Sequence, residues 1–214
     1  MRLILIRHGE SVGNREGFWQ GQLDYPLTAN GVKQARLLAE WLADEKIDAL
    51  YSSDLVRAKK TAEFIAAYHG LPVTTTPLLR EINLGRFQGL TRKQVEERYP
   101  EWAHVDWHQS GLEDVEQIGE LFHRAKEFIH QLWTAYKDKR IVAVTHGGFI
   151  NGLLMALLNI NWQGKKVFTL KNTSMTTIQF IDVDQVLIHG VNETPHLSKE
   201  RQKGETGNQN QAMG

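Results

Sequence analysis

Short apolar runs alternate along the chain with segments whose apolar residues recur at helical spacing. The short runs predict buried strands, because they are apolar or β-branched and end at polar residues. They cover residues 3–6, 47–51, 73–76 and 141–145. The periodic segments predict amphipathic helices over residues 32–42, 55–65, 115–133 and 149–158. A closing pair of strands is predicted over residues 176–181 and 186–188.

Strands that alternate with helices favour a mainly parallel sheet, because each parallel connection must cross back over the sheet. We therefore expect an α/β protein in three layers, with helices on both faces of a central sheet. Residues from about 78 to 111 break the alternation and are rich in Trp and charge, which predicts a small inserted cap. A single domain should then span residues 1–197, and the polar segment 198–214 should form a mobile tail.

The composition limits the expected partners. Lys and Arg number 25, as do Asp and Glu, so the chain lacks the basic excess that nucleic-acid-binding proteins usually carry. No stretch approaches the ~20 apolar residues of a membrane-spanning helix. Cysteine is absent, which excludes disulfides and thiolate metal sites and fits a cytoplasmic protein. Neither nucleic acid nor membrane is therefore expected as a partner, and the oligomeric state stays open.

Side chains with phosphate-binding chemistry follow three of the predicted strands. Arg7 and His8 end the first strand, and Arg57 follows the polar residues 52–54. His146 ends the most apolar strand. Ligands of open α/β sheets bind beyond the carboxyl ends of the strands, so these side chains should share one crevice. Guanidinium forks bind tetrahedral oxyanions and a neutral imidazole can attack phosphorus, although a lone histidine is more often structural.

Several motifs, taken in their order along the chain, resemble the histidine phosphatase superfamily, the phosphoglycerate mutase-like proteins. The resemblance spans about residues 3 to 197 and is closest to the broad-specificity phosphatase branch. It is carried by residues 7–11 with Asn14, 26–28 with Gly31, 52–58 with 61–62, Glu81 with Gly85 and Gly89, 145–148, and 192–197.

The resemblance implies a role for each matching residue. His8 would be the nucleophile that becomes phosphorylated, and Glu81 the proton donor. The phosphoryl and substrate contacts would come from Arg7, Asn14, Gln20, Gly21, Arg57 and His146. Glu81 lies among apolar residues, so burial is expected to raise its pKa toward neutrality. The alternative is that Glu81 only pairs with Arg80 or Arg86.

Hydrolysis and mutase chemistry can use the same set of residues. A mutase must hold a second anionic group, and its relatives use a close pair of arginines that this chain lacks. In the cap, Lys93 and Arg98 are interleaved with acidic residues. We therefore expect a metal-independent phosphatase of broad specificity for small phosphomonoesters. The alternatives are a phosphoglycerate mutase, an α-ribazole phosphatase, or a non-catalytic phosphate-binding module on the same fold.

Neither a cofactor nor a metal ion is expected, because the arginines neutralise the phosphoryl charge. His104 and His108 have the spacing of a metal site on a helix, but no third ligand is evident. The remaining feature is a group of aromatic residues that either line an apolar cleft beside the phosphate site or pack the cap onto the body. They are Phe18, Trp19, Phe87, Trp102 and Trp107.

Overall fold

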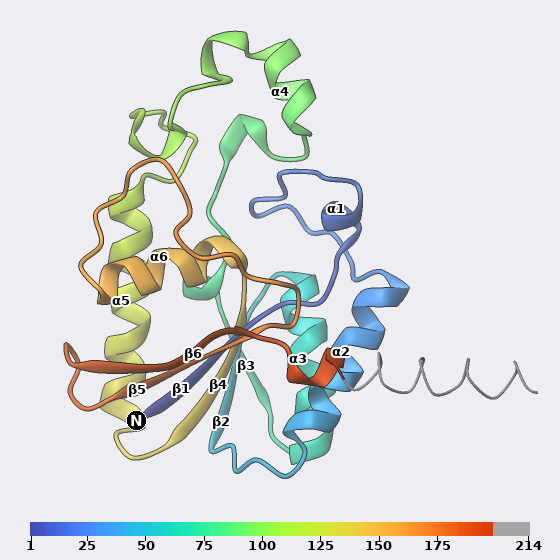
Figure 1. The fold of residues 1–214 in the computed structure, drawn as a ribbon, viewed down its shortest axis with the longest axis vertical. Coiled ribbons are helices and arrows are strands. Elements are labelled where there is room, and N and C mark those ends of the chain that lie inside the picture. Colours follow the sequence, from blue (N-terminus) through green and yellow to red (C-terminus); the bar gives the residue numbers. More distant parts are fainter. Residues whose placement is uncertain (199–214) are drawn as a thin grey trace, which may run out of the picture.

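The computed structural model describes residues 1–198, and within them a central sheet lies between two helical layers (Figure 1). The strands are β1 (Arg2–Arg7), β2 (Ala49–Ser53), β3 (Val73–Thr76), β4 (Arg140–Thr145), β5 (Met175–Phe180) and β6 (Val186–Glu193). The α-helices are α1 (Val12–Arg15), α2 (Ala29–Leu42), α3 (Val56–His69), α4 (Arg92–Arg98), α5 (Ile118–Ala135) and α6 (Gly147–Leu157). The short 3₁₀ turns are η1 (Pro77–Leu79), η2 (Gly85–Phe87), η3 (Pro100–Trp102) and η4 (Trp107–Gln109).

The strand order is β3-β2-β4-β1-β5-β6. The pairs β3–β2, β2–β4 and β4–β1 are parallel, whereas β5 runs antiparallel to both β1 and β6. This arrangement confirms the predicted three-layer α/β fold with a mainly parallel sheet and an antiparallel closing pair.

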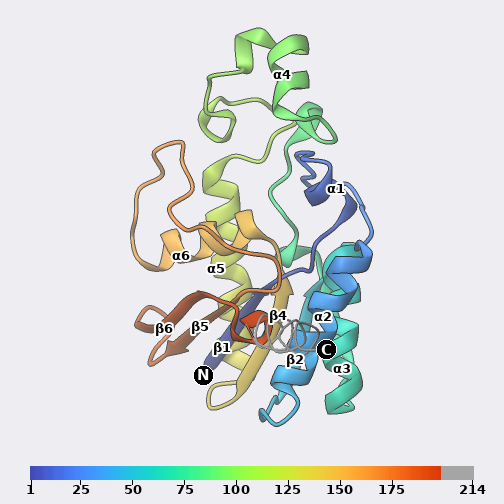
Figure 2. The ribbon, with the colours of Figure 1, turned by 45° about the vertical axis from the view of Figure 1, so that its right-hand side comes forward.

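The two helical layers lie on opposite faces of the sheet (Figure 2), and alternate residues of β1 pack against different layers. Leu3 and Leu5 of β1 pack in the cluster that includes α5 and α6. Ile4 and Ile6 pack in the opposite cluster, with residues of α2 and α3. Burying a side chain of this size contributes about 1.5–3 kcal/mol, so both faces of the strand hold the sheet between its helices.

Polar capping groups set helix boundaries that apolar periodicity does not mark. Helix α2 begins at Ala29, three residues before the predicted start, because the Thr28 hydroxyl accepts a hydrogen bond from the Gly31 N–H at 3.0 Å. Helix α5 begins at Ile118, three residues after the predicted start. There the Gln117 N–H donates to the Glu120 carboxylate at 2.7 Å.

The segment predicted as a cap extends beyond the carboxyl ends of the parallel strands (Figures 1 and 2). Phe87, Val95 and Val115 form a small core of their own there. Leu79 and Ile82 instead pack in the main core beside α5 and α6, so the chain leaves the body after Ile82. The domain boundaries at 1–197 and about 78–111 stay predictions, and the predicted mobile tail falls almost wholly outside the described residues. No helix within residues 1–198 is long and apolar enough to cross a membrane.

Candidate active site

The two candidate histidines meet at the carboxyl edge of the sheet because β1 and β4 are parallel neighbours. Arg7 lies opposite Thr145 in the register, and the His8 N–H donates to the Thr145 carbonyl at 2.9 Å. The His8 and His146 ring centroids are 5.1 Å apart. The topology thus brings together two motifs that are far apart in the sequence.

A backbone contact fixes the tautomer of His8. Its Nδ1 lies 2.7 Å from the Gly9 carbonyl oxygen. Since a carbonyl oxygen only accepts, Nδ1 carries the hydrogen and Nε2 carries the lone pair. A Cβ at Gly9 would lie 2.6 Å from the Gly31 carbonyl oxygen, so only glycine allows the start of α2 to approach this closely. The His8 ring is therefore oriented with its basic nitrogen away from the backbone.

Both imidazoles are neutral at neutral pH in the ligand-free protein. Burial, with the positive charges of Arg57 and Arg7 as further causes, holds the pKa of His8 well below 6.5. Burial and the same two arginines, together with the charge of Arg124, do the same to the pKa of His146. His8 itself has the unprotonated form that a nucleophile needs.

Neutral buried histidines predict a loss of stability in mild acid. An unfolded histidine has a pKa of about 6.5, whereas His8 and His146 lie well below it and burial lowers the pKa of His196 to about 4. Below pH ~6.5 the unfolded chain therefore binds more protons, and the free energy of unfolding falls by up to about 1.4 kcal/mol per pH unit for each histidine. Above that pH these residues contribute no pH dependence.

Urea unfolding at constant ionic strength between about pH 7.5 and pH 5 measures this effect, since most carboxylates stay ionised there. His196→Gln should reduce the slope, whereas replacing the exposed His189 with Gln should leave it unchanged. A free energy of unfolding that stays constant from pH 6.5 to pH 5 would contradict the neutral state of these histidines.

Backbone carbonyls hold the two arginines. Arg7 Nη1 donates to the Leu170 carbonyl at 2.6 Å. Arg57, only 1% exposed, donates from Nη1 to the Leu23 carbonyl at 2.7 Å and from Nη2 to the Gly21 carbonyl at 2.8 Å. Burial lowers the pKa of Arg57 to about 10, so it remains charged at neutral pH. Both cations are therefore fixed before any ligand binds.

Several buried nitrogen atoms around His8 have no partner within residues 1–198. They are Nε of Arg7, Nε of Arg57 and both ring nitrogens of His146. Unpaired buried polar atoms are costly, and such atoms in a native structure call for an explanation. A tetrahedral oxyanion would accept hydrogen bonds from the guanidinium groups among them.

A cavity of about 150 Å³ opens onto this group. Arg7, His8, Asn14, Gln20, Gly21, Arg57 and Glu81 line it. The structure therefore brings together every predicted site residue, with His146 fully buried and its ring beside that of His8. Asn14 Oδ1 accepts from Asn172 Nδ2 at 3.1 Å, and Gln20 Oε1 accepts from the Ser11 hydroxyl at 2.6 Å. The amide NH₂ groups of Asn14 and Gln20 are thus the parts that can donate to a ligand.

The carboxylate of Glu81 lies at the start of α6. Its Oε2 accepts from the Gly148 N–H at 3.1 Å, and its Oε1 accepts from Phe149 and Ile82 at 3.2 and 3.0 Å. A Cβ at Gly148 would collide with this carboxylate, so glycine is required for the contact. Neither predicted alternative partner binds Glu81, because Arg80 pairs with Asp54 and Arg86 with Asp114.

The prediction that burial raises the pKa of Glu81 is wrong for the ligand-free protein. Burial does act in that direction, but the charge of Lys166 and the N–H groups of Ile82 and Gly148 outweigh it, with a smaller effect from Arg57. The pKa of Glu81 is therefore below its ordinary value, and the carboxyl is ionised at neutral pH.

Sequence reasoning missed Lys166 and the part that His108 plays. Lys166 lines the cavity from the loop between α6 and β5, where no periodicity or motif marks it. His108 also lines the cavity, and its Nδ1 contacts the Glu116 carbonyl at 3.0 Å. The turn η4 covers only residues 107–109, so His104 and His108 do not share a helix. No group of three or more metal-binding side chains gathers in the described part of the chain.

Of the five aromatic residues singled out above, only Phe18 and Trp19 line the cavity. Phe87 is buried and stacks on Trp107 at 3.9 Å between ring centroids. The Trp107 indole donates to the Trp102 carbonyl at 2.7 Å. Both expectations therefore hold in part: Phe18 and Trp19 line the cavity, and Trp102 and Trp107 pack against the cap core around Phe87. Trp19 does both, because its ring lies 4.5 Å from that of Trp107.

An α/β fold with paired imidazoles and guanidiniums at the carboxyl edge of its sheet defines an enzyme that handles phosphoryl groups. The sequence model of the histidine phosphatase superfamily (branch 1) matches residues 3–194. The chain belongs to this superfamily, which confirms the resemblance seen in its motifs.

Individual relatives agree with this assignment. Phosphoserine phosphatase 1 of Hydrogenobacter thermophilus is 32% identical over 203 residues, which cover 93% of this chain and 95% of that protein. The phosphoserine phosphatase of Entamoeba histolytica in complex with 3-phosphoglyceric acid has a TM-score of 0.80 at 30% identity, covering 92% of this chain and 98% of that one. The α-ribazole phosphatase of Shigella flexneri has a TM-score of 0.81 at 28% identity, with 91% and 97% covered. The family and these relatives class the chain as a phosphoric monoester hydrolase acting on small phosphorylated substrates.

Proposed function

We propose that this protein hydrolyses phosphomonoesters through a phosphohistidine intermediate on His8, with broad specificity for the alcohol. The observation that carries the proposal is the ring of buried, unpartnered nitrogen atoms of Arg7, Arg57 and His146 around a neutral His8. Fixed cations and donors of this kind stabilise charge on phosphoryl oxygens without reorganising during the reaction.

Binding of the substrate comes first. A phosphomonoester carries about two negative charges at neutral pH, and Arg7 and Arg57 offset them. An anion next to a neutral imidazole favours the charged form, so the pKa of His146 rises on binding and the ring takes up a proton. Asn14 and Gln20 donate from their amide groups. Arg7 and Arg57 are cations, which disfavour a metal ion at this point, and the scheme requires neither metal nor cofactor.

Phosphoryl transfer to His8 follows. The Nε2 lone pair attacks phosphorus while the bond from phosphorus to the ester oxygen breaks, and Nδ1–H stays bonded to the Gly9 carbonyl. The leaving alkoxide needs a proton, which Glu81 delivers. Glu81 acquires that proton when the substrate binds, because the anionic phosphoryl group raises the pKa of a neighbouring carboxyl. A substrate monoanion, whose second pKa is about 6, can also supply it.

Hydrolysis of the phosphohistidine completes the cycle. Glu81 is now ionised and removes a proton from a water molecule. The hydroxide attacks phosphorus, the bond between phosphorus and Nε2 breaks, and the electron pair returns to His8. Inorganic phosphate leaves, and Glu81 releases its proton, which restores the ionised carboxylate of the ligand-free protein.

The cavity walls favour hydrolysis of varied esters over mutase chemistry. Phe18 and Trp19 offer apolar surface beside the phosphate site, which suits leaving groups of different shape. A mutase would need cap cations such as Lys93 and Arg98 at the cavity to hold a second anion. Neither residue lines it, and Lys93 pairs with Glu97 at 3.8 Å. Lys166 lines the cavity in addition to Arg7 and Arg57, so the test must include substrates with a second anionic group.

A panel of phosphomonoesters with a metal chelator present tests the proposal. We expect free phosphate from p-nitrophenyl phosphate, phosphoserine and both phosphoglycerates, at rates that the chelator does not reduce. Isomerised phosphoglycerate without phosphate release would establish a mutase instead. Turnover of α-ribazole phosphate alone would contradict broad specificity, and binding without turnover would point to a phosphate-binding module. A cytoplasmic location stays a prediction.

A further inference from the structure

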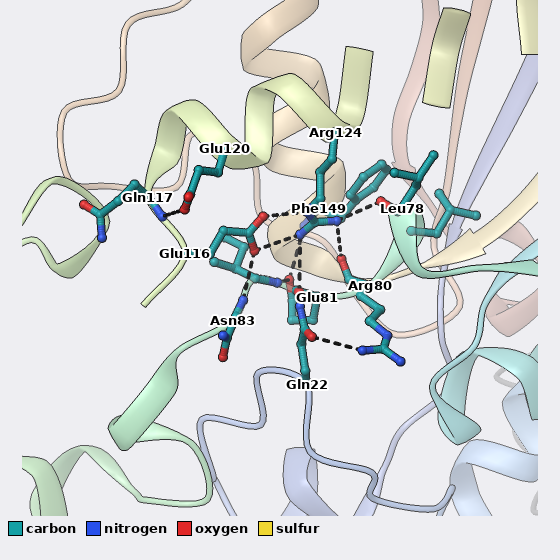
Figure 3. A network of polar contacts seen from close by, with 12 residues as sticks. Gln22, Leu78, Arg80, Glu81, Asn83, Glu116, Gln117, Glu120, Arg124 and Phe149 are labelled. Carbon is teal, nitrogen blue, oxygen red and sulfur yellow. Dashed lines mark hydrogen bonds and ion pairs between the residues drawn. The ribbon is translucent and has the colours of Figure 1, made fainter. Parts of the chain in front are cut away.

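A buried arginine behind the active site makes contacts that the proposed mechanism does not use. Arg124 lies on α5, and its side chain points at the segment that carries Glu81 (Figure 3). Its side chain is 15% exposed, and that of its partner Glu116 is 10% exposed. Arg124 does not line the cavity, so it has no direct access to a substrate there.

The guanidinium of Arg124 binds consecutive parts of the Glu81 segment. Nη1 donates to the carbonyls of Leu78 and Arg80, both at 2.8 Å, and Nη2 donates to the carbonyl of Glu81 itself at 3.3 Å (Figure 3). Arg124 therefore ties the backbone around Glu81 to α5, while Gln22 Nε2 donates to the same Glu81 carbonyl at 3.1 Å from the opposite side of the chain segment.

Glu116 binds both Arg124 and the backbone of the residues that follow Glu81. It accepts from Nε and Nη2 of Arg124 at 2.5 and 3.0 Å, and from the N–H of Asn83 at 3.0 Å. The Glu116 N–H in turn donates to the Asn83 carbonyl at 2.9 Å. Each of the five N–H donors of a guanidinium thus has an acceptor here, which the three donors of a lysine cannot match.

Arg124 also touches the group that orients the Glu81 carboxylate. Its Cζ lies 5.2 Å from the centroid of the Phe149 ring, and the Phe149 N–H donates to Glu81 Oε1 at 3.2 Å. One guanidinium therefore fixes the backbone of the acid and packs on the residue that holds its carboxylate. A buried ion pair contributes little net stability compared with apolar residues of equal size. The main consequence of the pair between Arg124 and Glu116 is therefore the position of the segment that carries Glu81.

We propose that Arg124, held by Glu116, is a positioning residue that aims the Glu81 carboxyl at the leaving-group oxygen. This inference rests on the proposed acid role of Glu81. Proton transfer depends on placement within hydrogen-bond reach, so a small displacement of Glu81 slows the reaction of esters whose leaving group needs a proton. Esters with a stable leaving anion depend far less on it.

Arg124→Lys tests the inference, because it keeps the charge near His146 and removes the fork. We expect kcat/KM for phosphoserine to fall about 10–100-fold and kcat/KM for p-nitrophenyl phosphate to change less than about threefold. The ratio kcat/KM is the right measure because it reports steps up to the first irreversible one. Glu116→Gln removes the charge of the partner. It should also lower kcat/KM for phosphoserine more than kcat/KM for p-nitrophenyl phosphate, as Arg124→Lys does.

Arg86→Lys is the matched control. Arg86 makes a similar forked pair with Asp114 near Glu81, but it is exposed and touches no carbonyl of residues 78–81 in the described chain. Arg86→Lys should leave the ratio of kcat/KM for phosphoserine to kcat/KM for p-nitrophenyl phosphate unchanged. Thermal unfolding of each variant confirms that the comparison is made on folded protein, and Glu116→Gln decides the question if Arg124→Lys does not fold.

A double-mutant cycle separates positioning from a general structural effect. In a Glu81→Gln background, Arg124→Lys should cause no further loss of kcat/KM for phosphoserine, because the carboxyl group that Arg124 positions is absent. Equal losses on both substrates, or losses that add to those of Glu81→Gln, would overturn the inference while leaving the proposed function intact. If Glu81→Gln alone affects both substrates equally, the acid role fails and the positioning role fails with it.

Discussion

His8→Ala is expected to lower kcat by about 10⁵-fold and to leave no phosphorylated enzyme. Removing the nucleophile of a covalent mechanism costs on that order, because only binding and charge stabilisation remain. Both remain in this variant, since Arg7 and Arg57 are held by backbone carbonyls and not by His8. The variant should therefore still bind inorganic phosphate while failing to turn over substrate.

Two measurements check this result. Steady-state phosphate release gives the loss in kcat, and rapid quenching with radiolabelled substrate should show an acid-labile, alkali-stable label in the wild type only, as a phosphorus–nitrogen bond requires. His130→Ala, an exposed histidine on α5, is the control and should retain full activity. If His8→Ala and the wild type turned over equally, His8 would have no place in the mechanism.

Glu81→Gln is expected to lower kcat/KM for phosphoserine by about 10³-fold and that for p-nitrophenyl phosphate by less than about tenfold. A general acid contributes about 10²–10⁴-fold where the leaving group must be protonated, and little where the leaving anion is stable. The amide keeps the size of the side chain, but it has no proton to give at neutral pH. The difference between the two esters therefore isolates proton donation from substrate binding.

The same two esters, assayed as a series with intermediate leaving groups, give the measurement. A plot of log kcat/KM against leaving-group pKa should be steep for Glu81→Gln and shallow for the wild type. Glu97→Gln, an exposed residue of the cap, is the control. A uniform loss across the series would rule out Glu81 as the acid.

The sheet and its helices are predictable from the sequence because burial imposes a local period. Residues 3–6 are apolar on both faces of a central strand, and each alternate pair does pack against a different helical layer. The meeting of His8 and His146 is equally predictable, because parallel neighbours end at the same edge of a sheet. The parallel pairing of β1 and β4 therefore places the strand ends at His8 and His146 in one site.

Charge states and supporting contacts are not predictable in this way. Besides the N–H of the adjacent Ile82, the pKa of Glu81 depends on Lys166 and on the Gly148 N–H at the start of α6, which are far from it in the sequence. Arg124 and Glu116 look like an ordinary charged pair on and before a helix, and only the fold shows that they bind the backbone of residues 78–83. These contacts join distant segments, so no local pattern reports them.

In the proposed mechanism, the main-chain anchoring of the guanidiniums separates recognition of the phosphoryl group from recognition of the alcohol. The carbonyls of Gly21, Leu23 and Leu170 perform the anchoring, and every amino acid supplies a carbonyl. Substitutions at positions such as Leu23, whose side chain is 40% exposed, therefore keep the anchor as long as the loop keeps its path. We therefore expect mutagenesis of the surrounding loops to change which esters are hydrolysed while the positions of Arg7 and Arg57 stay the same.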